Sequence, residues 1–156
     1  MLDNESQLWV VSQFEIEIAE VDVAASLIAR GFDLSGRWEL DTASRARFIG
    51  EAPKERGVYA FAVDGNVCYV GSTQHIAKRL RRYESTDIRR KEFRGTRRTA
   101  FPVMGLIIKA LKGGSEVEVL TIVPGSMRRK GLPVDLSAGI EKGLIRELRP
   151  ECNRRE

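Results

Sequence analysis

The sequence predicts an α/β protein of the α+β kind, with a small mixed or antiparallel central sheet flanked by helices. Two β-rich runs share residues 57–71, residues 116–123 alternate with a period of two, and residues 136–148 carry apolar side chains at helical spacing. At 156 residues the chain is long enough for one core and too short for two comfortable ones. We expect a domain over residues 51–156, with residues 1–50 packed on it as an N-terminal elaboration.

Within the N-terminal part, residues 14–23 alternate between apolar and acidic side chains, which is typical of a half-buried strand. The pattern merges into helical spacing over residues 19–31, and Gly31 is suited to end that helix. The pattern of residues 32–40 favours neither a helix nor a strand. Residues 41–49 suggest a short helix.

The clearest local signal is a hairpin formed by residues 57–63 and 66–71. Residues 64–66 read Asp-Gly-Asn, and these residue types tolerate the positive φ angles of a tight hairpin turn. The second arm ends where the chain turns into an amphipathic helix, for which Ser72 or Thr73 is the expected N-terminal cap.

The remaining elements follow from composition and periodicity. We expect a basic loop or short helix at residues 89–98 and a helix at 102–111 that ends at a Gly-Gly pair. A strand over 116–123, a basic loop over 125–135 and a helix over 136–148 complete the chain, and a proline stops the last helix.

Charge is distributed unevenly along the chain. Residues 1–50 have a net charge of −5 and residues 51–156 a net charge of +9, although the whole chain is only +4. Between residues 78 and 98, 10 of 21 side chains are Lys or Arg. Such a run indicates either a surface that faces nucleic-acid phosphates or a solvated helix face, and charge alone favours neither.

Composition also excludes several kinds of site. No stretch approaches the roughly 18 apolar residues of a membrane span, and the N-terminus does not resemble a secretory signal, so we expect a cytoplasmic protein without a membrane partner. Cys68 and Cys152 belong to no metal or disulfide pattern. His75 is the single histidine and cannot alone build a histidine metal site or a conventional triad. Catalysis must therefore rest on Tyr, Arg, Glu, Asp or Lys.

Two short motifs stand in the two arms of the hairpin. The first reads Gly57-Val58-Tyr59 and the second Tyr69-Val70-Gly71, and Arg79 and Tyr83 follow one helical turn apart. With these residues the chain resembles the GIY-YIG endonucleases. The stretch from Tyr69 to Tyr83 is particularly similar to the nuclease domain of the bacterial excision-repair incision subunit.

Two later landmarks of the family also match. A helical glutamate corresponds to Glu141, and an asparagine soon after that helix corresponds to Asn153. The resemblance covers about residues 56–153, and it implies the GIY-YIG fold and metal-dependent hydrolysis of DNA phosphodiester bonds.

The resemblance assigns a catalytic role to five residues. Tyr59 would act as general base, and Tyr69 would hold the phosphate, support the hydrogen-bond network or simply pack in the core. Arg79 would bind phosphate oxygens with its planar guanidinium, and Tyr83 would donate its hydroxyl to the same phosphate. Glu141 would be the sole protein ligand of Mg²⁺, or of Mn²⁺ as a substitute, with water and phosphate oxygens completing the shell.

Other residues are expected near the substrate. Lys78, Arg81 and Arg82 would contact the DNA backbone or remain solvated, and Asn153 would anchor the chain and orient the site. Ser72 stands where repair-type relatives have a lysine, directly after the second motif. A cation needed there would have to come from elsewhere, with His75 and Lys78 as candidates.

Residues 79 and 141 are separated by an unusually long, basic insertion for such a small domain. This favours a free-standing restriction-type endonuclease that cuts duplex DNA at specific sites, with a homodimer as a hypothesis from the family. The alternatives are a structure-specific nuclease of repair or recombination and a catalytically silent nucleic-acid-binding module.

Overall fold

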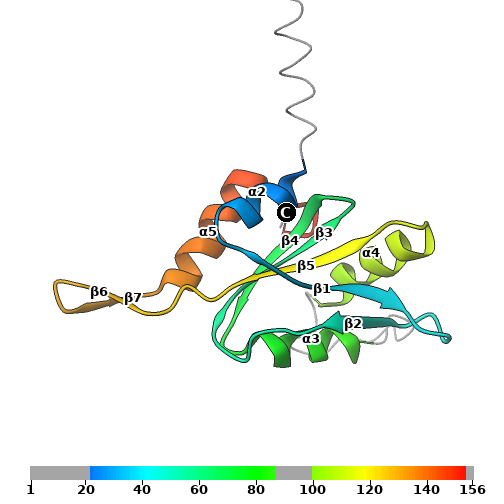
Figure 1. Ribbon diagram of the computed structural model, residues 1–156, viewed down its shortest axis with the longest axis horizontal. Helices are drawn as coiled ribbons and strands as arrows, with labels where there is room; N and C mark the ends of the chain where they lie inside the picture. The colour runs from blue at the N-terminus through cyan, green and yellow to red at the C-terminus, as the bar shows by residue number, and fades with distance from the viewer. Residues whose placement is uncertain (1–21, 87–99, 154–156) are drawn as a thin grey trace, which may run out of the picture.

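A computed structural model describes residues 22–86 and 100–153 (Figure 1). The elements in chain order are α2 (Val23–Ala29), β1 (Asp33–Leu40), β2 (Ala46–Gly50), β3 (Gly57–Val63), β4 (Asn66–Thr73), α3 (Ile76–Glu84), α4 (Ala100–Lys112), β5 (Val117–Ile122), β6 (Met127–Arg129), β7 (Leu132–Val134), α5 (Leu136–Leu148) and a short 3₁₀ turn, η2 (Glu151–Asn153). The predicted fold class is confirmed.

Five strands form one antiparallel sheet in the order β2-β1-β5-β3-β4. Helices α2 and α5 cover one face, and α3 and α4 cover the other (Figure 1). Strand β3 is buried on both faces, which explains why its sequence is a continuous apolar run without polar alternation. Among the described strands β4 lies at the edge of the sheet, so none of them pairs with the outer side of the second motif.

The predicted hairpin is confirmed as β3 and β4. Asp64 and Gly65 have φ angles of 47° and 84°, as a two-residue type I′ turn requires. The turn is also held from outside, because the backbone N–H of Asp64 donates to the carbonyl of Glu116 over 2.9 Å. The side chain of Asp64 in return accepts a hydrogen bond from the N–H of Glu116.

The helices and strand predicted over residues 102–111, 136–148 and 116–123 are confirmed as α4, α5 and β5. The helix expected within residues 19–31 is confirmed as α2, and Gly31 follows it with a φ of 108°. The strand expected at residues 14–23 and the segment 89–98 lie mostly or wholly outside the described residues, and Val23 begins α2.

The short helix expected at residues 41–49 is wrong. Asp41 instead begins a tight turn by accepting hydrogen bonds from the N–H groups of Ala43 and Arg45, and the chain then forms β2. Phe48 packs edge-on against Trp38 of β1 at a centroid distance of 5.9 Å. Pairing with β1 therefore outweighs the weak helical propensity of this segment.

Two further expectations need correction. The N-terminal cap of α3 is His75 rather than Ser72 or Thr73, because β4 continues through Thr73 and keeps both residues in the sheet. The basic loop expected over residues 125–135 contains a second hairpin, β6–β7, which forms its own two-stranded sheet.

Strands β1 and β2 lie within residues 1–50, yet β1 pairs with β5 inside the main sheet. The boundary expected at residue 50 stays a prediction. Among the described residues, no helix combines the length and the apolar character that crossing a membrane needs.

Candidate active site

The three tyrosines of the chain meet in one cluster on the face of the sheet that α3 covers. Tyr59 comes from β3, Tyr69 from β4 and Tyr83 from α3, and their ring centroids are 5.9 to 6.5 Å apart. The phenol oxygens of Tyr59 and Tyr83 are hydrogen-bonded over 2.9 Å. All three are buried, with Tyr69 the most exposed at 7%.

The glycines of the two motifs are explained by close packing. A Cβ atom at Gly71 would lie 2.6 Å from both Cζ and Oη of Tyr59, which faces Gly71 across the β3–β4 pair. A Cβ atom at Gly57 would collide with the carbonyl oxygen of Ile122. The bare backbone at Gly71 therefore lets the hydroxyl end of Tyr59 extend over the edge strand β4.

Burial and charge act in opposite directions on the phenol of Tyr59. Burial is the main cause that raises the pKa of Tyr59 above its ordinary value of 10, and the neighbouring Tyr69 adds to this. The hydrogen bond with Tyr83 and the positive charge of Arg79 lower the pKa of Tyr59. Arg79 is thus close enough to stabilise a phenolate on Tyr59, although burial dominates in the free protein.

Helix α3 carries a buried apolar stripe and a basic outer surface. Arg79 lies beside the stripe and is partly buried, whereas Lys78, Arg81 and Arg82 are exposed. Because an α-helix presents residues 79 and 83 on neighbouring turns of one face, Arg79 stands next to the tyrosine cluster. The other three cations point to solvent.

His75 and Ser72 lie at the junction of β4 and α3. The Nδ1 atom of His75 accepts a hydrogen bond from the backbone N–H of Lys78 over 3.1 Å, which caps the helix. Ser72 is partly buried and pairs with Val58 of β3. His75 therefore has a structural role that occupies one of its two ring nitrogens.

Glu141 lies on α5, which packs against the opposite face of the sheet from α3. Leu144 of this helix belongs to the same apolar cluster as Val70 of β4, and Ile140 packs against that cluster. Glu141 is partly buried, and in residues 22–86 and 100–153 no ion pair involves its carboxylate. The structure thus brings Tyr59, Tyr69, Tyr83 and Arg79 together but leaves Glu141 on the other side of strand β4.

Asn153 holds the edge strand between the two motif residues Tyr69 and Gly71. Its Oδ1 accepts from the N–H of Val70 and its Nδ2 donates to the carbonyl of Val70, each over 2.8 Å. The side chain thus makes the two hydrogen bonds that a neighbouring strand would make at this point. Both polar atoms of the Asn153 amide are occupied by the backbone.

A metal ion at this site would depend on a single carboxylate. The part of the chain that the structure describes contains no cluster of three or more His, Cys, Asp or Glu side chains. Mg²⁺ is commonly held by one or two carboxylates with water and phosphate oxygens in the remaining positions, so the carboxylate of Glu141, which has no ion-pair partner among the described residues, fits such an ion.

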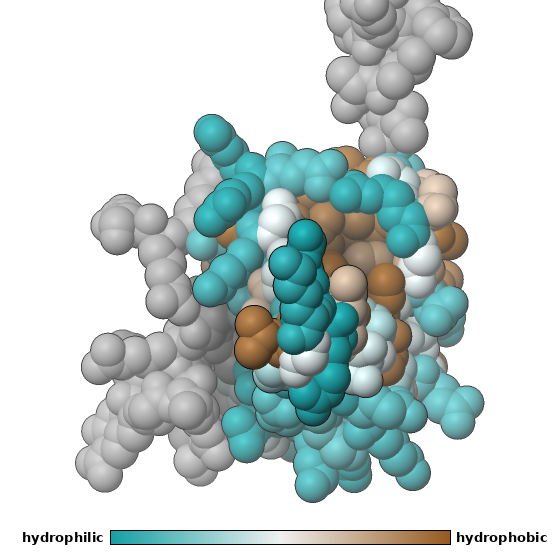
Figure 2. All heavy atoms as spheres, turned by 90° about the vertical axis from the view of Figure 1, so that its left-hand side faces the viewer, coloured by the Kyte–Doolittle hydropathy of each residue, from teal (hydrophilic) through white to brown (hydrophobic). Residues whose placement is uncertain are grey.

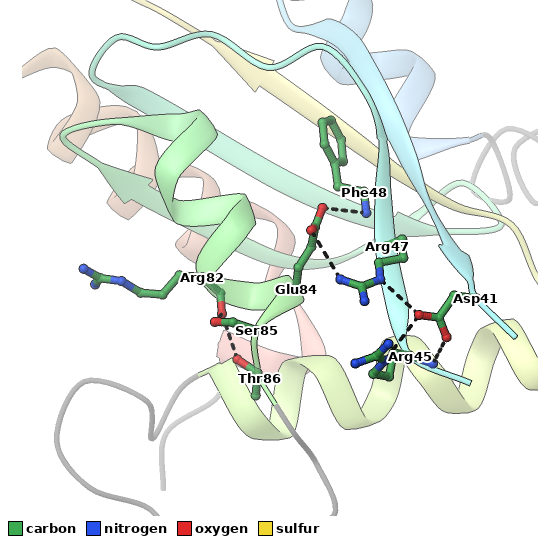
Figure 3. Close-up of polar contacts among 8 residues, drawn as sticks. All are labelled: Asp41, Arg45, Arg47, Phe48, Arg82, Glu84, Ser85 and Thr86. Atoms are coloured by element: carbon green, nitrogen blue, oxygen red, sulfur yellow. Dashed lines mark hydrogen bonds and ion pairs between the residues drawn. The ribbon is translucent and has the colours of Figure 1, made fainter. Parts of the chain in front are cut away.

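Sequence reasoning missed a polar tether next to Tyr83. Glu84 accepts a hydrogen bond from the backbone N–H of Phe48 over 3.0 Å, and its other oxygen lies 3.9 Å from Arg47 (Figure 3). Arg47 continues to Asp41, which also binds Arg45. The network links the end of α3 to the edge strand β2, and nothing in the spacing of these residues indicates their contact.

Comparisons with known proteins agree with this architecture. No protein-family model matches the sequence, and no curated protein matches it significantly. Among solved structures, a mutant of EndoII from bacteriophage T4 superposes with a TM-score of 0.66 at 23% identity, over 84% of this chain and 98% of that chain. The magnesium-bound GIY-YIG endonuclease domain of UvrC from Thermotoga maritima reaches 0.42 at 26% identity, over 66% and 88% of the two chains. The restriction endonuclease HPY188I, solved with product DNA, reaches 0.48 at 16% identity, over 82% and 79%.

The chain has the GIY-YIG nuclease fold. The fold that the sequence resemblance implies is therefore confirmed. In this GIY-YIG fold the two motifs occupy the inner strand β3 and the edge strand β4, and the helix after them carries Arg79 and Tyr83.

Proposed function

We propose that the chain is a divalent-metal-dependent endonuclease that hydrolyses phosphodiester bonds in duplex DNA. The observation that carries the proposal is the convergence of Tyr59, Tyr69 and Tyr83 with the charge of Arg79 beside the edge strand of a GIY-YIG fold. Edge strand β4 separates this cluster from Glu141, so a phosphate placed at the edge is accessible from both sides of the sheet.

In this proposal Arg79 binds the phosphate and stabilises the charge that develops on its oxygens. Tyr59 takes a proton from the attacking water, and Tyr83 is its hydrogen-bond partner in the free protein. Because Tyr59 is fully buried, substrate binding has to open the contact with Tyr83 before Tyr59 can reach water. Tyr69, the least buried of the three, orients the phosphate.

Glu141 would hold the divalent ion, Mg²⁺ in the first place and Mn²⁺ as a substitute. Bound there, the ion would supply charge neutralisation for the phosphate and its leaving oxygen. The chain itself contributes two features. Leu144 packs α5 into the apolar cluster that includes Val70 of β4, and the carboxylate of Glu141 has no ion-pair partner among the described residues.

The exposed cations Lys78, Arg81 and Arg82 would contact the DNA backbone around the reacting phosphate. Ser72 would line the same approach. Asn153 was expected near the substrate, and its amide is occupied by Val70, which supports a role in fixing the edge strand.

We further propose restriction-type, site-specific cutting by a homodimer, in which two active sites act on the two strands. Sedimentation in the presence of a duplex measures the mass of the complex. A single chain per DNA would contradict the dimer, and a smear of fragments instead of discrete bands would contradict site-specific cutting.

The central test is cleavage of a long duplex at low salt with and without Mg²⁺. We expect metal-dependent cutting by the wild type and loss of at least 100-fold in Glu141→Ala and in Tyr59→Phe. Glu147→Ala is the matched control, because Glu147 lies on the same helix but pairs with Arg30, the residue that follows α2. If the wild type bound DNA but did not cut it under any of these conditions, the nuclease proposal would be wrong and the chain would be a nucleic-acid-binding module.

A further inference from the structure

The hairpin β6–β7 projects away from the body of the molecule (Figure 1). Its two strands pair with each other and form a sheet separate from the main one. Every residue from Gly125 to Asp135 is exposed, so the hairpin contributes no side chain to either core cluster. Because the hairpin does not contribute to the core, packing does not explain why the chain forms it.

The hairpin has a defined shape. Lys130 and Gly131 form its two-residue turn with φ angles of 51° and 78°, which is the type I′ geometry that matches the twist of paired strands. The guanidinium of Arg128 donates to the carbonyl oxygen of Gly131 over 2.9 Å and closes the tip. The hairpin therefore has a regular, hydrogen-bonded conformation.

Its chemistry is basic at the tip and apolar along one face. Arg128, Arg129 and Lys130 are consecutive, and residues 124–134 contain no acidic side chain. Directly opposite residues share a face in an antiparallel pair. The pairs Met127–Val134 and Arg129–Leu132 therefore place three apolar side chains around one arginine. Leu132 is 69% exposed, and Met127 and Val134 are also exposed.

Figure 2 looks at the molecule from the side of the hairpin. The hairpin is largely hydrophilic there, with hydrophobic side chains and a recess beside it. A hollow of about 680 Å³ lies at the root of the hairpin, with Arg56 before the first motif and Ser137 of α5 in its walls. The root thus opens directly beside the elements that carry the candidate site.

The hairpin is coupled firmly to α5. Asp135 follows β7 immediately, caps α5 by accepting from the N–H of Ala138 over 3.0 Å, and forms an ion pair with Arg56. The chain length from Lys130 to Asp135 is about 17 Å as a strand. From Asp135 to Glu141 it is about 9 Å as a helix.

We propose that the β6–β7 hairpin is an arm that enters a groove of duplex DNA within one helical turn of the bond being cut. This rests on the proposed function. A two-stranded ribbon fits the major groove, where Arg129 and Lys130 meet base edges or phosphates and Leu132 packs on apolar base or sugar atoms. The chain lengths put the tip at most about 26 Å from Glu141, which corresponds to about 8 base pairs.

Binding without metal tests the arm independently of cleavage. Fluorescence anisotropy with a labelled 30-base-pair duplex compares the wild type with Arg129→Ala/Lys130→Ala. We expect Kd to rise roughly tenfold or more and the slope of log Kd against log salt to fall by about 2, since two phosphate or base contacts are lost.

The matched control is Lys109→Ala/Lys112→Ala, which removes the same charge from the end of α4. We expect a change in Kd of less than about twofold for this control, because general attraction is weak once salt screens it. An equal loss of DNA affinity in both variants would mean that the hairpin contributes only its general positive charge, and this would overturn the proposal.

Substrate length gives a second test. The wild type should lose affinity for duplexes that end about 4 base pairs from the cut on the hairpin side, whereas the hairpin variant should not distinguish them from longer duplexes. Unchanged binding by the hairpin variant would refute the arm alone. If the wild type bound no DNA at all, both the arm and the proposed function would be refuted. If the hairpin variant cut DNA as well as the wild type, the arm would be refuted and the nuclease function would stand.

Leu132→Ser separates DNA contact from self-association. We expect weaker DNA binding with an unchanged sedimentation mass for the free protein. A smaller mass with unchanged DNA affinity would show that the apolar face binds a second copy, and the proposal would then be wrong.

Discussion

The phenol oxygens of Tyr59 and Tyr83 form a buried hydrogen bond of 2.9 Å between strand β3 and helix α3. Either Tyr59→Phe or Tyr83→Phe removes this hydrogen bond from the partner hydroxyl inside the core, which should lower the free energy of unfolding by about 1–3 kcal/mol. The double Phe variant removes both hydroxyls, so its stability should lie near that of the better single variant. Urea unfolding of the four proteins measures the coupling, and strictly additive losses would contradict it.

Gly71 is required by the ring of Tyr59. Gly71→Ala places a methyl group 2.6 Å from the ring carbon and oxygen, and we expect a loss of about 1–3 kcal/mol from forced repacking. Gly105→Ala is the control, because Gly105 lies in α4 with no atom within 4 Å of an added Cβ. It should gain about 0.5–1 kcal/mol from helix propensity. Thermal unfolding checks both, and a neutral Gly71→Ala would disprove the packing argument.

Glu84 fastens the end of α3 to β2 mainly through the N–H of Phe48. Glu84→Ala should cost about 1.5 kcal/mol, because a partly buried donor loses its charged acceptor. Glu84→Gln should recover most of this, since its amide oxygen can accept and the ion pair with Arg47 is long at 3.9 Å. Urea unfolding distinguishes the two, and equal losses would mean that the ion pair dominates.

The raised pKa of Tyr59 predicts how cleavage depends on pH. If Tyr59 is the general base, only its phenolate form accepts the proton, and that form grows about tenfold per pH unit below the pKa. Burial holds the pKa of Tyr59 above its ordinary value, so kcat/KM should rise with a slope of about 1 from pH 6.5 to 9. A rate that levels off below pH 8, measured at fixed free Mg²⁺, would assign the base to another group.

The two cysteines are neighbours in space. A hydrogen bond with Cys152 and burial raise the pKa of the Cys68 thiol, while the same hydrogen bond lowers the pKa of Cys152. Because the thiolate is the reactive form, iodoacetamide should label Cys152 well before Cys68 in the folded protein. Peptide mass spectrometry after a time course measures the order, and earlier labelling of Cys68 would contradict the arrangement.

Local sequence chemistry was sufficient for several elements. Asp64 and Gly65 specify a type I′ turn by themselves, because both accept positive φ. The apolar stripe that ends at Leu148 before Pro150 likewise specifies α5. The two motifs with Arg79 and Tyr83 identified the fold family, because their order and spacing can be read from the sequence without knowing any distance in the folded protein.

Other features depended on contacts between one strand and another. Residues 41–49 became a turn and a strand only because Phe48 meets Trp38, and His75 became the cap of α3 only because β4 extends through Thr73. Neither outcome has a strong signal within its own segment, so pairing with the neighbouring strand decided both.

For the candidate site, the sequence by itself determined which residue types are present: three tyrosines, a helical arginine, a lone glutamate and an asparagine after a proline. The tertiary structure decided that strand register stacks Tyr59 over Gly71, that Asn153 closes the edge at Val70, and that Glu141 approaches from the opposite face. The physical reason is that hydrogen-bond capacity and conformational preference belong to single residues. Burial, register and sheet order belong to pairs of segments far apart in the chain.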